Sequence, residues 1–172
     1  AISLTYPARF TLAAAMNPCP CGHRDDPRTR CTCGDHQIRS YIQKITGPLL
    51  DRLDLQVDVP AAGGAEISSH VTRIRVARAI SRQKDRFGKG SVRFNGLLPP
   101  DRLKDMISLS QSGRKYLEGV CAPSFRRLHS LLRVSRTIAD LDDCEEVHDS
   151  HLLEAFHYSC SDYFRINGPG NA

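Results

Sequence analysis

Two Cys-x-Cys pairs near the start of the chain could close on a single metal ion. Zinc in a structural site takes four ligands in a tetrahedron at about 2.0 to 2.3 Å, and two short loops bearing thiolates can supply them. The stretch between the pairs, HRDDPRTR, is too polar to pack a core, so a bound metal would explain how this loop is held. The sequence therefore predicts structural zinc, with free or redox-active thiols as the alternative. The predicted ligands are Cys19, Cys21, Cys31 and Cys33.

Neighbouring residues leave alternatives open for the ligand set. Cys-x-Cys is tighter than the Cys-x2-Cys spacing of many zinc sites, and His23 and His36 lie close enough in sequence to replace a thiolate. Four protein ligands leave no position for water, so catalysis by the metal is not expected. Cys121, Cys144 and Cys160 lie beside helical patterns and are expected to be ordinary buried thiols. A disulfide framework is not expected without a secretory context.

Polar residues also stand at the ends of predicted elements, where α/β proteins often place functional groups. Asn17 closes an apolar run over 9–16 that is typical of a strand buried on both faces. Arg52 lies in a turn before a second predicted strand, and Arg126 lies at the start of a predicted helix. Each also fits an ordinary role, because Asn is common in turns before Pro and exposed arginines are common on surfaces.

The first sixty residues alternate between predicted strands, a loop and a helix. Residues 18–34 are rich in Pro, Gly, Cys and charge and are expected to form a loop. A helix is predicted over 35–46, with Asp35 as its N-cap. Apolar and polar residues alternate over 53–59, which predicts a strand. The Pro/Gly/Ala-rich stretch 60–65 is expected to be a linker at a domain boundary.

The rest of the chain has helical periodicity and ends in a Gly/Pro-rich tail that is expected to be disordered. The first of its helices carries an arginine stripe, which is more often a solvated face than a nucleic-acid groove. The stripe consists of Arg75, Arg78, Arg82 and Arg86. The predicted helices span 66–87, 100–119, 124–141 and 149–164.

The charge is mildly basic and no segment is apolar enough to span a bilayer. The formal net charge is +5, and four zinc-bound thiolates with Zn²⁺ would change it by −4 + 2, to about +3. This balance is compatible with nucleotide or nucleic-acid partners. No signal peptide is visible, so a soluble cytoplasmic protein is expected. The chain begins at Ala1 without Met and is expected to be a piece of a larger protein.

Several sequence strings, taken in order, resemble the ComM/YifB family of bacterial magnesium-chelatase-like AAA+ ATPases. They are PARFTLAAAMNPCPCG, GPLLDRLDLQVDVP, SFRRLHSLLRVSRTIADL and HLLEAFHY. The resemblance covers nearly the whole chain, and NPCPCG and RTIADL are specific strings. The spacing of the cysteine pairs is also similar to that family.

The resemblance implies a role for each of the three polar residues. Asn17 would be the sensor 1 residue that orients the water attacking the γ-phosphate of ATP. Arg52 would be the arginine finger that reaches the neighbouring subunit's site, and Arg126 would be the sensor 2 arginine of a helical lid. These roles match what phosphoryl transfer needs, namely charge neutralisation and a positioned water. In this family the Walker A and B segments, which hold ATP and Mg²⁺, lie N-terminal to Ala1, so this chain alone is expected to be inactive.

The resemblance therefore predicts the end of an α/β AAA+ core over 1–60, with a metal-binding insertion over 18–36, and an all-helical lid over 61–172. The parent protein would be a homo-oligomeric ring, expected to be a hexamer, that acts on DNA as a branch-migration helicase in natural transformation and recombination. One alternative is a chelatase-type ATPase that remodels a protein partner. Another is a stand-alone zinc module that binds nucleic acid, although no aromatic residue lies between the cysteine pairs for base stacking.

Overall fold

The computed structural model describes residues 3–4, 10–24, 26–45, 47–59, 68–119 and 124–159. Helices account for 56% of these residues. The predicted linker over 60–65, the C-terminal tail, Cys121 and Cys160 lie outside the described residues. No helix in the described ranges combines the length and the apolar character that crossing a bilayer requires.

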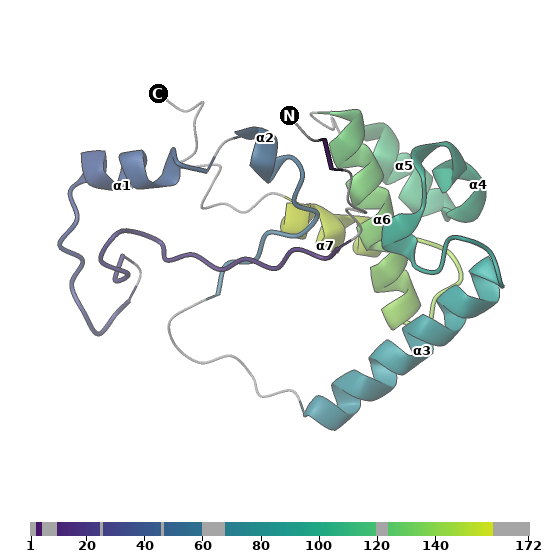
Figure 1. The fold of residues 1–172 in the computed structure, drawn as a ribbon. Helices are drawn as coiled ribbons and strands as arrows, with labels where there is room; N and C mark the ends of the chain where they lie inside the picture. The colour runs from purple at the N-terminus through teal and green to yellow at the C-terminus, as the bar shows by residue number, and fades with distance from the viewer. Residues whose placement is uncertain are drawn as a thin grey trace.

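Helices α3 to α7 gather on one side of the structure, and α1 with the cysteine-bearing segment lies on the other (Figure 1). Short 3-10 turns, η1 at Asn95–Leu97 and η2 at Pro100–Arg102, follow α3. The helices are α1 Asp35–Ile42, α2 Gly47–Leu50, α3 Ser69–Phe87, α4 Leu103–Met106, α5 Gln111–Gly119, α6 Phe125–Leu141 and α7 Asp149–Ser159.

The α/β core expected from the sequence is wrong for this structure, because no sheet forms among the described residues. Strands were expected over 9–16 and 53–59, but the described residues 10–16 and 53–59 form none. Most of their apolar side chains are exposed, as Phe10 at 77% and Val59 at 85% illustrate. A strand is stable only when neighbouring strands satisfy its backbone groups, and no neighbour is present within the described chain. Alternation alone therefore predicted strands that do not form here.

The helix expected over 100–119 is interrupted, because the backbone around Leu109 pairs instead with the segment before α7. Leu109 and Val147 form an isolated parallel bridge. The Val147 N–H donates to Ser108 O at 2.9 Å, and the Ser110 N–H donates to Val147 O at 3.1 Å. This pairing separates α4 from α5 and fixes the chain that leads into α7.

Helix α6 lies at the centre of the helical part and packs against α3, α4 and α7. We use the word lid as a label for the described residues of this part, 68–119 and 124–159. Its N-cap is Ser124, whose Oγ accepts the Arg127 N–H at 3.2 Å. Leu131 and Ile138 are buried at helical spacing, as the sequence predicted, together with Ser135. The apolar lid core is completed by Leu98, Leu103, Ile107, Ala139, Val147, Leu152 and Ala155.

A fully buried carboxylate, Asp140 of α6, joins three elements of the lid. Arg86 of α3 donates to both of its oxygens, at 2.9 and 2.5 Å. Arg136 donates to it at 2.9 Å, and Asn95 of η1 at 2.8 Å. Burial alone would raise the pKa of Asp140, but hydrogen bonds from Arg86 and Asn95 and the charge of Arg136 hold it below its usual value. The carboxylate is therefore ionised and bonded to its neighbours from three sides.

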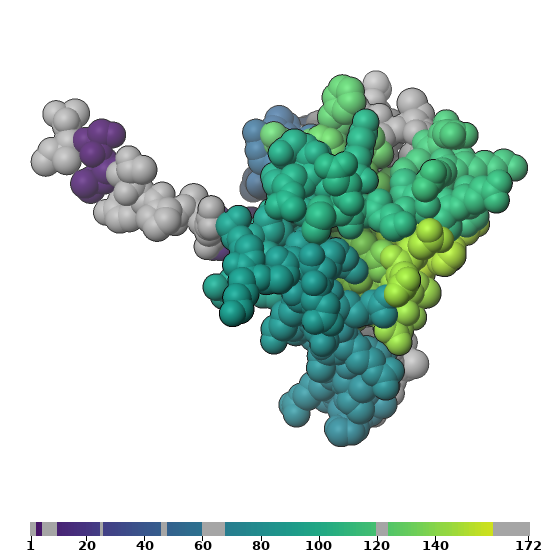
Figure 2. All heavy atoms as spheres, turned by 90° about the vertical axis from the view of Figure 1, so that its right-hand side faces the viewer, coloured from purple at the N-terminus to yellow at the C-terminus, as the bar shows by residue number. Residues whose placement is uncertain are grey.

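Three of the four stripe arginines on α3 form ion pairs with the end of α6 or the residues after it, while Arg75 and Arg78 are also exposed, as expected for a solvated face. Besides Arg86, Arg75 pairs with Asp142 at 2.7 Å and Arg82 pairs with Asp143 at 2.6 Å. The first half of α3 nevertheless extends beyond the other helices, and residues 68–78 are all exposed (Figures 1 and 2). The stripe is thus an attachment of α3 to the end of α6.

We expect Asp140→Asn to destabilise the lid by about 3 to 5 kcal/mol, because it leaves Arg86 and Arg136 close together without a counter-ion. Urea unfolding followed by circular dichroism measures this loss. The matched control is Asp143→Asn, which removes the partner of Arg82 at a carboxylate that is 63% exposed. The control should lose less than about 1 kcal/mol. Equal losses in the two variants would contradict the assigned role of Asp140.

The lowered pKa of Asp140 also gives the sign of a pH dependence. A carboxyl whose pKa falls on folding adds stability above its unfolded pKa, which for Asp is about 3.9. That stability should decrease as the pH falls below this value toward the folded-state pKa of Asp140. Unfolding curves recorded between pH 6 and pH 2 should show this acid loss in the parent chain and a smaller one in Asp140→Asn.

Candidate functional site

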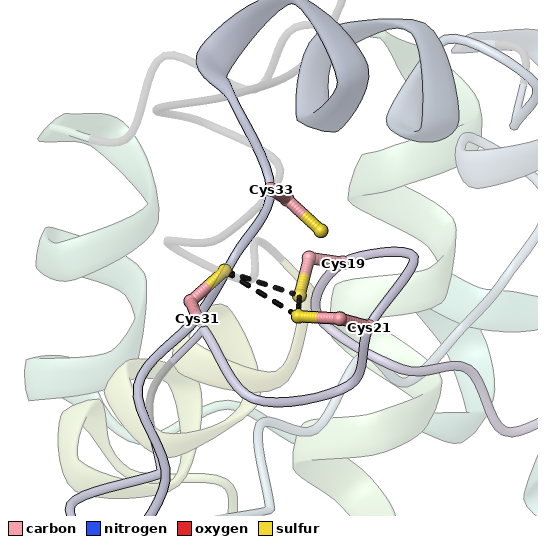
Figure 3. Close-up of side chains that lie close together, drawn as sticks. All are labelled: Cys19, Cys21, Cys31 and Cys33. Atoms are coloured by element: carbon pink, nitrogen blue, oxygen red, sulfur yellow. Dashed lines mark hydrogen bonds between the residues drawn. The ribbon is translucent and has the colours of Figure 1, made fainter.

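The four cysteines of the two Cys-x-Cys pairs converge on one point (Figure 3). Their sulfurs all lie within 4.8 Å of one another. The Sγ atom of Cys21 lies 3.3 Å from that of Cys19 and 3.5 Å from that of Cys31, and the Cys19–Cys31 separation is 3.7 Å. Four sulfurs around a tetrahedral zinc at 2.3 Å would be about 3.8 Å apart. The separations among the Cys19, Cys21 and Cys31 sulfurs are therefore close to the edge length of such a tetrahedron.

The first pair lies on a tight turn that ends at Gly22. The Gly22 N–H donates to Cys19 O at 3.0 Å and closes the turn. Gly22 has φ of +84°, in the left-handed region where a glycine is favoured. The second pair leads directly into α1, whose N-cap is Gly34 rather than the expected Asp35. The Gly34 N–H donates to Gln37 Oε1 at 3.1 Å, and the helix begins at Asp35, two residues after Cys33.

Helix α1 covers the sulfur cluster on one side. Cys19 is fully buried and forms a small core with Ile38 and Ile42 of α1. Tyr41 and the other three cysteines pack around this core. The cluster is therefore both the centre of this segment's packing and its main buried apolar surface among the described residues.

The two histidines considered as substitute ligands are placed elsewhere. His23 Nδ1 lies 3.5 Å from Asp26 Oδ2, and Asp26 also accepts the Arg28 N–H at 2.9 Å. His36 is exposed on the first turn of α1. Among the described residues, the only group of side chains close enough to share a metal is the four cysteines.

The thiols differ in how easily they ionise. Backbone N–H groups of His23 and Thr32 lower the pKa of Cys21 to about 5. Burial and the neighbouring sulfurs raise the pKa of Cys33 to about 12. One thiolate is thus favoured at neutral pH, and each further ionisation is opposed by the negative charge already present. A divalent cation would supply the opposite charge that four thiolates need, so the donor set fits zinc.

Asn17 lies beside the cysteine turn. Its side chain is exposed, and its Nδ2 atom lies 3.5 Å from the point where a Cβ on Gly22 would stand. The other two polar residues of interest are in different elements. Arg52 follows α2, and Arg126 is the second residue of α6. Within the described residues, no hydrogen bond or ion pair joins Asn17, Arg52 and Arg126 to one another, so their assigned roles stay predictions.

Arg52 is exposed, and its Nη1 donates to Pro48 O at 2.6 Å, one turn earlier. The residues on either side of it are attached to α6. Arg127 Nε donates to Asp51 Oδ1 at 3.0 Å. Ser130 Oγ donates to Asp54 Oδ1 at 2.6 Å. The Arg52 side chain is therefore presented to solvent from a turn that is fixed on both sides.

Sequence reasoning overlooked Arg127, which holds the 50–54 segment against the lid. Besides Asp51, its guanidinium donates to Leu50 O at 3.3 Å and to Ser159 O of α7. Adjacent residues on a helix point about 100° apart, so Arg126 and Arg127 cannot both face the 50–54 segment. Two consecutive arginines near a helix start indicate that only one of them contacts the rest of the protein. Here Arg126 is the exposed one.

Two family models match the chain and together cover nearly all of it. One is described as magnesium chelatase, subunit ChlI, and matches residues 1–67. The other is described as magnesium chelatase, subunit ChlI C-terminal, and matches residues 66–159. The chain belongs to the magnesium-chelatase-like family that includes ComM and YifB. The two matches meet at 66–67, beside the boundary expected at 60–65.

Relatives support the same family. The uncharacterised protein YifB of Escherichia coli is 33% identical over 171 residues, which cover 95% of this chain and 33% of YifB. The competence protein ComM of Haemophilus influenzae is 34% identical over 166 residues, covering 90% of this chain and 31% of ComM. An uncharacterised protein of Mycobacterium bovis is 42% identical over 87 residues, covering 46% of this chain and 17% of that relative. The chain spans about a third of the length of YifB and ComM.

We expect the chain to bind one equivalent of zinc, and Cys31→Ser to lose most of it, because a hydroxyl is a poor replacement for a thiolate ligand. Metal analysis of protein purified without added zinc, with thiol titration before and after a chelator, tests this. Cys144→Ser is the matched control, since Cys144 is a half-buried thiol in the lid, outside the cluster. Acidification should release the metal, because protons compete for the thiolates. Metal-free protein with four rapidly titrating thiols in the folded state would contradict the site.

Proposed function

We propose that the chain is part of a ring-forming AAA+ ATPase in which it supplies groups that act on the bound nucleotide. The observation that carries this proposal is the match of the two family models over residues 1–159, which includes Asn17, Arg52 and Arg126. The exposure of all three side chains supports it, because each would be accessible to a nucleotide held by other segments.

Each residue suits one requirement of phosphoryl transfer. The side-chain amide of Asn17 can orient an attacking water by donating and accepting hydrogen bonds. Arg52 carries a permanently charged planar fork that matches phosphate oxygens, and it would reach the nucleotide of the neighbouring subunit. Arg126 would neutralise the same phosphate from the lid. The parent protein would bind ATP and Mg²⁺ through segments outside this chain.

The cysteine cluster would hold zinc in a structural role. Cys19, Cys21, Cys31 and Cys33 would be the four ligands and would leave no open position for a substrate. The bound ion would cross-link the loop between the pairs to α1, and the loop contributes no other core among the described residues.

DNA is the substrate that we favour for the parent protein. The similarity to a relative named competence protein ComM supports a role in natural transformation. We propose that the parent acts there as a hexameric cytoplasmic branch-migration helicase. The second candidate is a chelatase-type ATPase that remodels a protein. Its support is that the matching family models are described as magnesium chelatase. Stimulation of the parent's ATPase by branched DNA, but not by protein partners, would distinguish the two.

The chain alone should not hydrolyse ATP, because its sequence contains no Gly-x4-Gly-Lys-Ser/Thr motif to cradle the phosphates. Phosphate release by the purified chain in the presence of ATP and Mg²⁺ is the measurement. Turnover that disappears on mutating a residue of this chain would show that it holds a complete site.

In the parent protein, Arg52→Ala should lower ATP turnover by roughly 10³- to 10⁵-fold while nucleotide binding persists. Arg52→Lys should restore little, because Lys offers only a point charge. The matched control is Arg39→Ala, which removes an exposed arginine on α1. Steady-state ATPase assays and a nucleotide-binding assay measure both effects.

Mixed rings separate action in trans from action within one subunit. Subunits carrying Arg52→Ala, combined with subunits whose phosphate-binding loop is disabled, should regain part of the activity, since each mutant leaves a different half of a shared site intact. Wild-type turnover by Arg52→Ala rings would show that Arg52 only bonds its own turn through Pro48.

A further inference from the structure

We propose that the metal-binding turn positions the Asn17 side chain, so that metal loading of the cysteine cluster sets where this residue points. Gly22 is the positioning residue through which the two are connected. The role of Asn17 in catalysis rests on the proposed function above, but its dependence on the metal does not.

The Asn17 side chain lies beside the turn, next to the open side of Gly22. The Asn17 Nδ2 and Cγ atoms lie 3.5 and 3.8 Å from the position of a Cβ on Gly22, and no other described atom beyond its chain neighbours lies within 4 Å of that point. The Asn17 amide therefore lies over the one residue of the turn that has no side chain. A glycine here permits the φ of +84°, and a Cβ at this position would be in van der Waals contact with the amide.

The cysteines determine the shape of that turn. Cys19 begins it and Cys21 lies within it, and their sulfurs are 3.3 Å apart. Cys19 is buried against α1, so the start of the turn is anchored, and the Gly22 N–H closes the turn onto the same residue. A metal shared with the second cysteine pair would hold both sulfurs at fixed distances from one centre. Without that cross-link, the turn would be left with backbone hydrogen bonds, such as those to Cys19 O and to the Cys21 sulfur, and the small core around Cys19.

Asn17 has no comparable support on its other side. No hydrogen bond joins its side chain to any residue that the structure describes, and the preceding residues 10–16 are exposed. Among the described residues, the turn at Gly22 is therefore the neighbour through which the Asn17 side chain would be positioned. Because a misplacement of about 1 Å in a catalytic group can slow a reaction on the order of a hundredfold, loss of the metal would reduce the catalytic use of Asn17.

The test uses the complete chain, labelled with ¹⁵N and loaded with one equivalent of zinc. Removing zinc with a chelator should shift or broaden the Asn17 side-chain amide resonances in the NMR spectrum, and adding zinc back should restore them. Asn95 is the internal control, because its amide is buried in the lid and bonded to Asp140. The Asn95 resonances should stay unchanged.

A variant pair separates positioning from general loosening of the loop. Gly22→Ala adds a methyl group against the Asn17 amide and should shift its resonances while the chain still binds zinc. Gly88→Ala is the matched control, since Gly88 also has a positive φ, +58°, but nothing lies within 4 Å of its Cβ position. In the parent protein, Gly22→Ala should lower kcat roughly ten- to a hundredfold with little change in KM for ATP.

Asn17 resonances that are unchanged by both zinc removal and Gly22→Ala would overturn the proposal, as would failure of the chain to bind zinc. Shifted resonances together with full ATPase activity of Gly22→Ala would instead leave the positioning intact and overturn the catalytic role of Asn17. The NMR result and the activity result therefore distinguish failure of this inference from failure of the proposed function.

Discussion

The lid depends on one buried negative charge, the carboxylate of Asp140. Taking a carboxylate out of water is unfavourable unless several donors replace the lost hydration, and here Arg86, Arg136 and Asn95 do so together. Arg86 lies on α3, Asn95 on η1 and Arg136 on α6. The hydrogen bonds to Asp140 therefore also fix α3, η1 and the end of α6 relative to one another. Arg136 extends the arrangement by donating to the carbonyls of Cys144 and Glu145, which shapes the chain leaving α6.

The cysteine-bearing segment is stabilised by different interactions from those of the lid. Its buried core is small, consisting of Cys19 with Ile38 and Ile42, and most of its loop is polar. Such a segment gains little from the hydrophobic effect, so a metal cross-link would be its principal stabilising interaction. The molecule thus combines a lid organised around an internal ion network with a loop organised around sulfur atoms.

The sequence predicted α3, α6 and the start of α7 close to their observed positions because helices are local structures. The apolar spacing of Leu131 and Ile138 placed α6 close to its observed bounds. The two Cys-x-Cys pairs predicted a cluster of four sulfurs, which the structure contains.

Sequence patterns failed where the structure depends on partners distant in sequence. The alternating run over 53–59 has no strand beside it in the described chain, and the backbone at Leu109 pairs with Val147 across a long sequence separation. The pairing of α3 arginines with Asp140, Asp142 and Asp143 was likewise invisible to periodicity.

The attachment made by Arg127 has a mechanical consequence. This guanidinium, with the Ser130–Asp54 bond and the Gln56 N–H that donates to Tyr158 O at 2.7 Å, joins the 50–56 segment to both α6 and α7. Any torque applied to these two helices is therefore transmitted to the turn that carries Arg52, and a force on that turn is transmitted back. The turn that carries Arg52 and the first turn of α6, which carries Arg126, are therefore joined, so a rotation of this unit would displace both cations together.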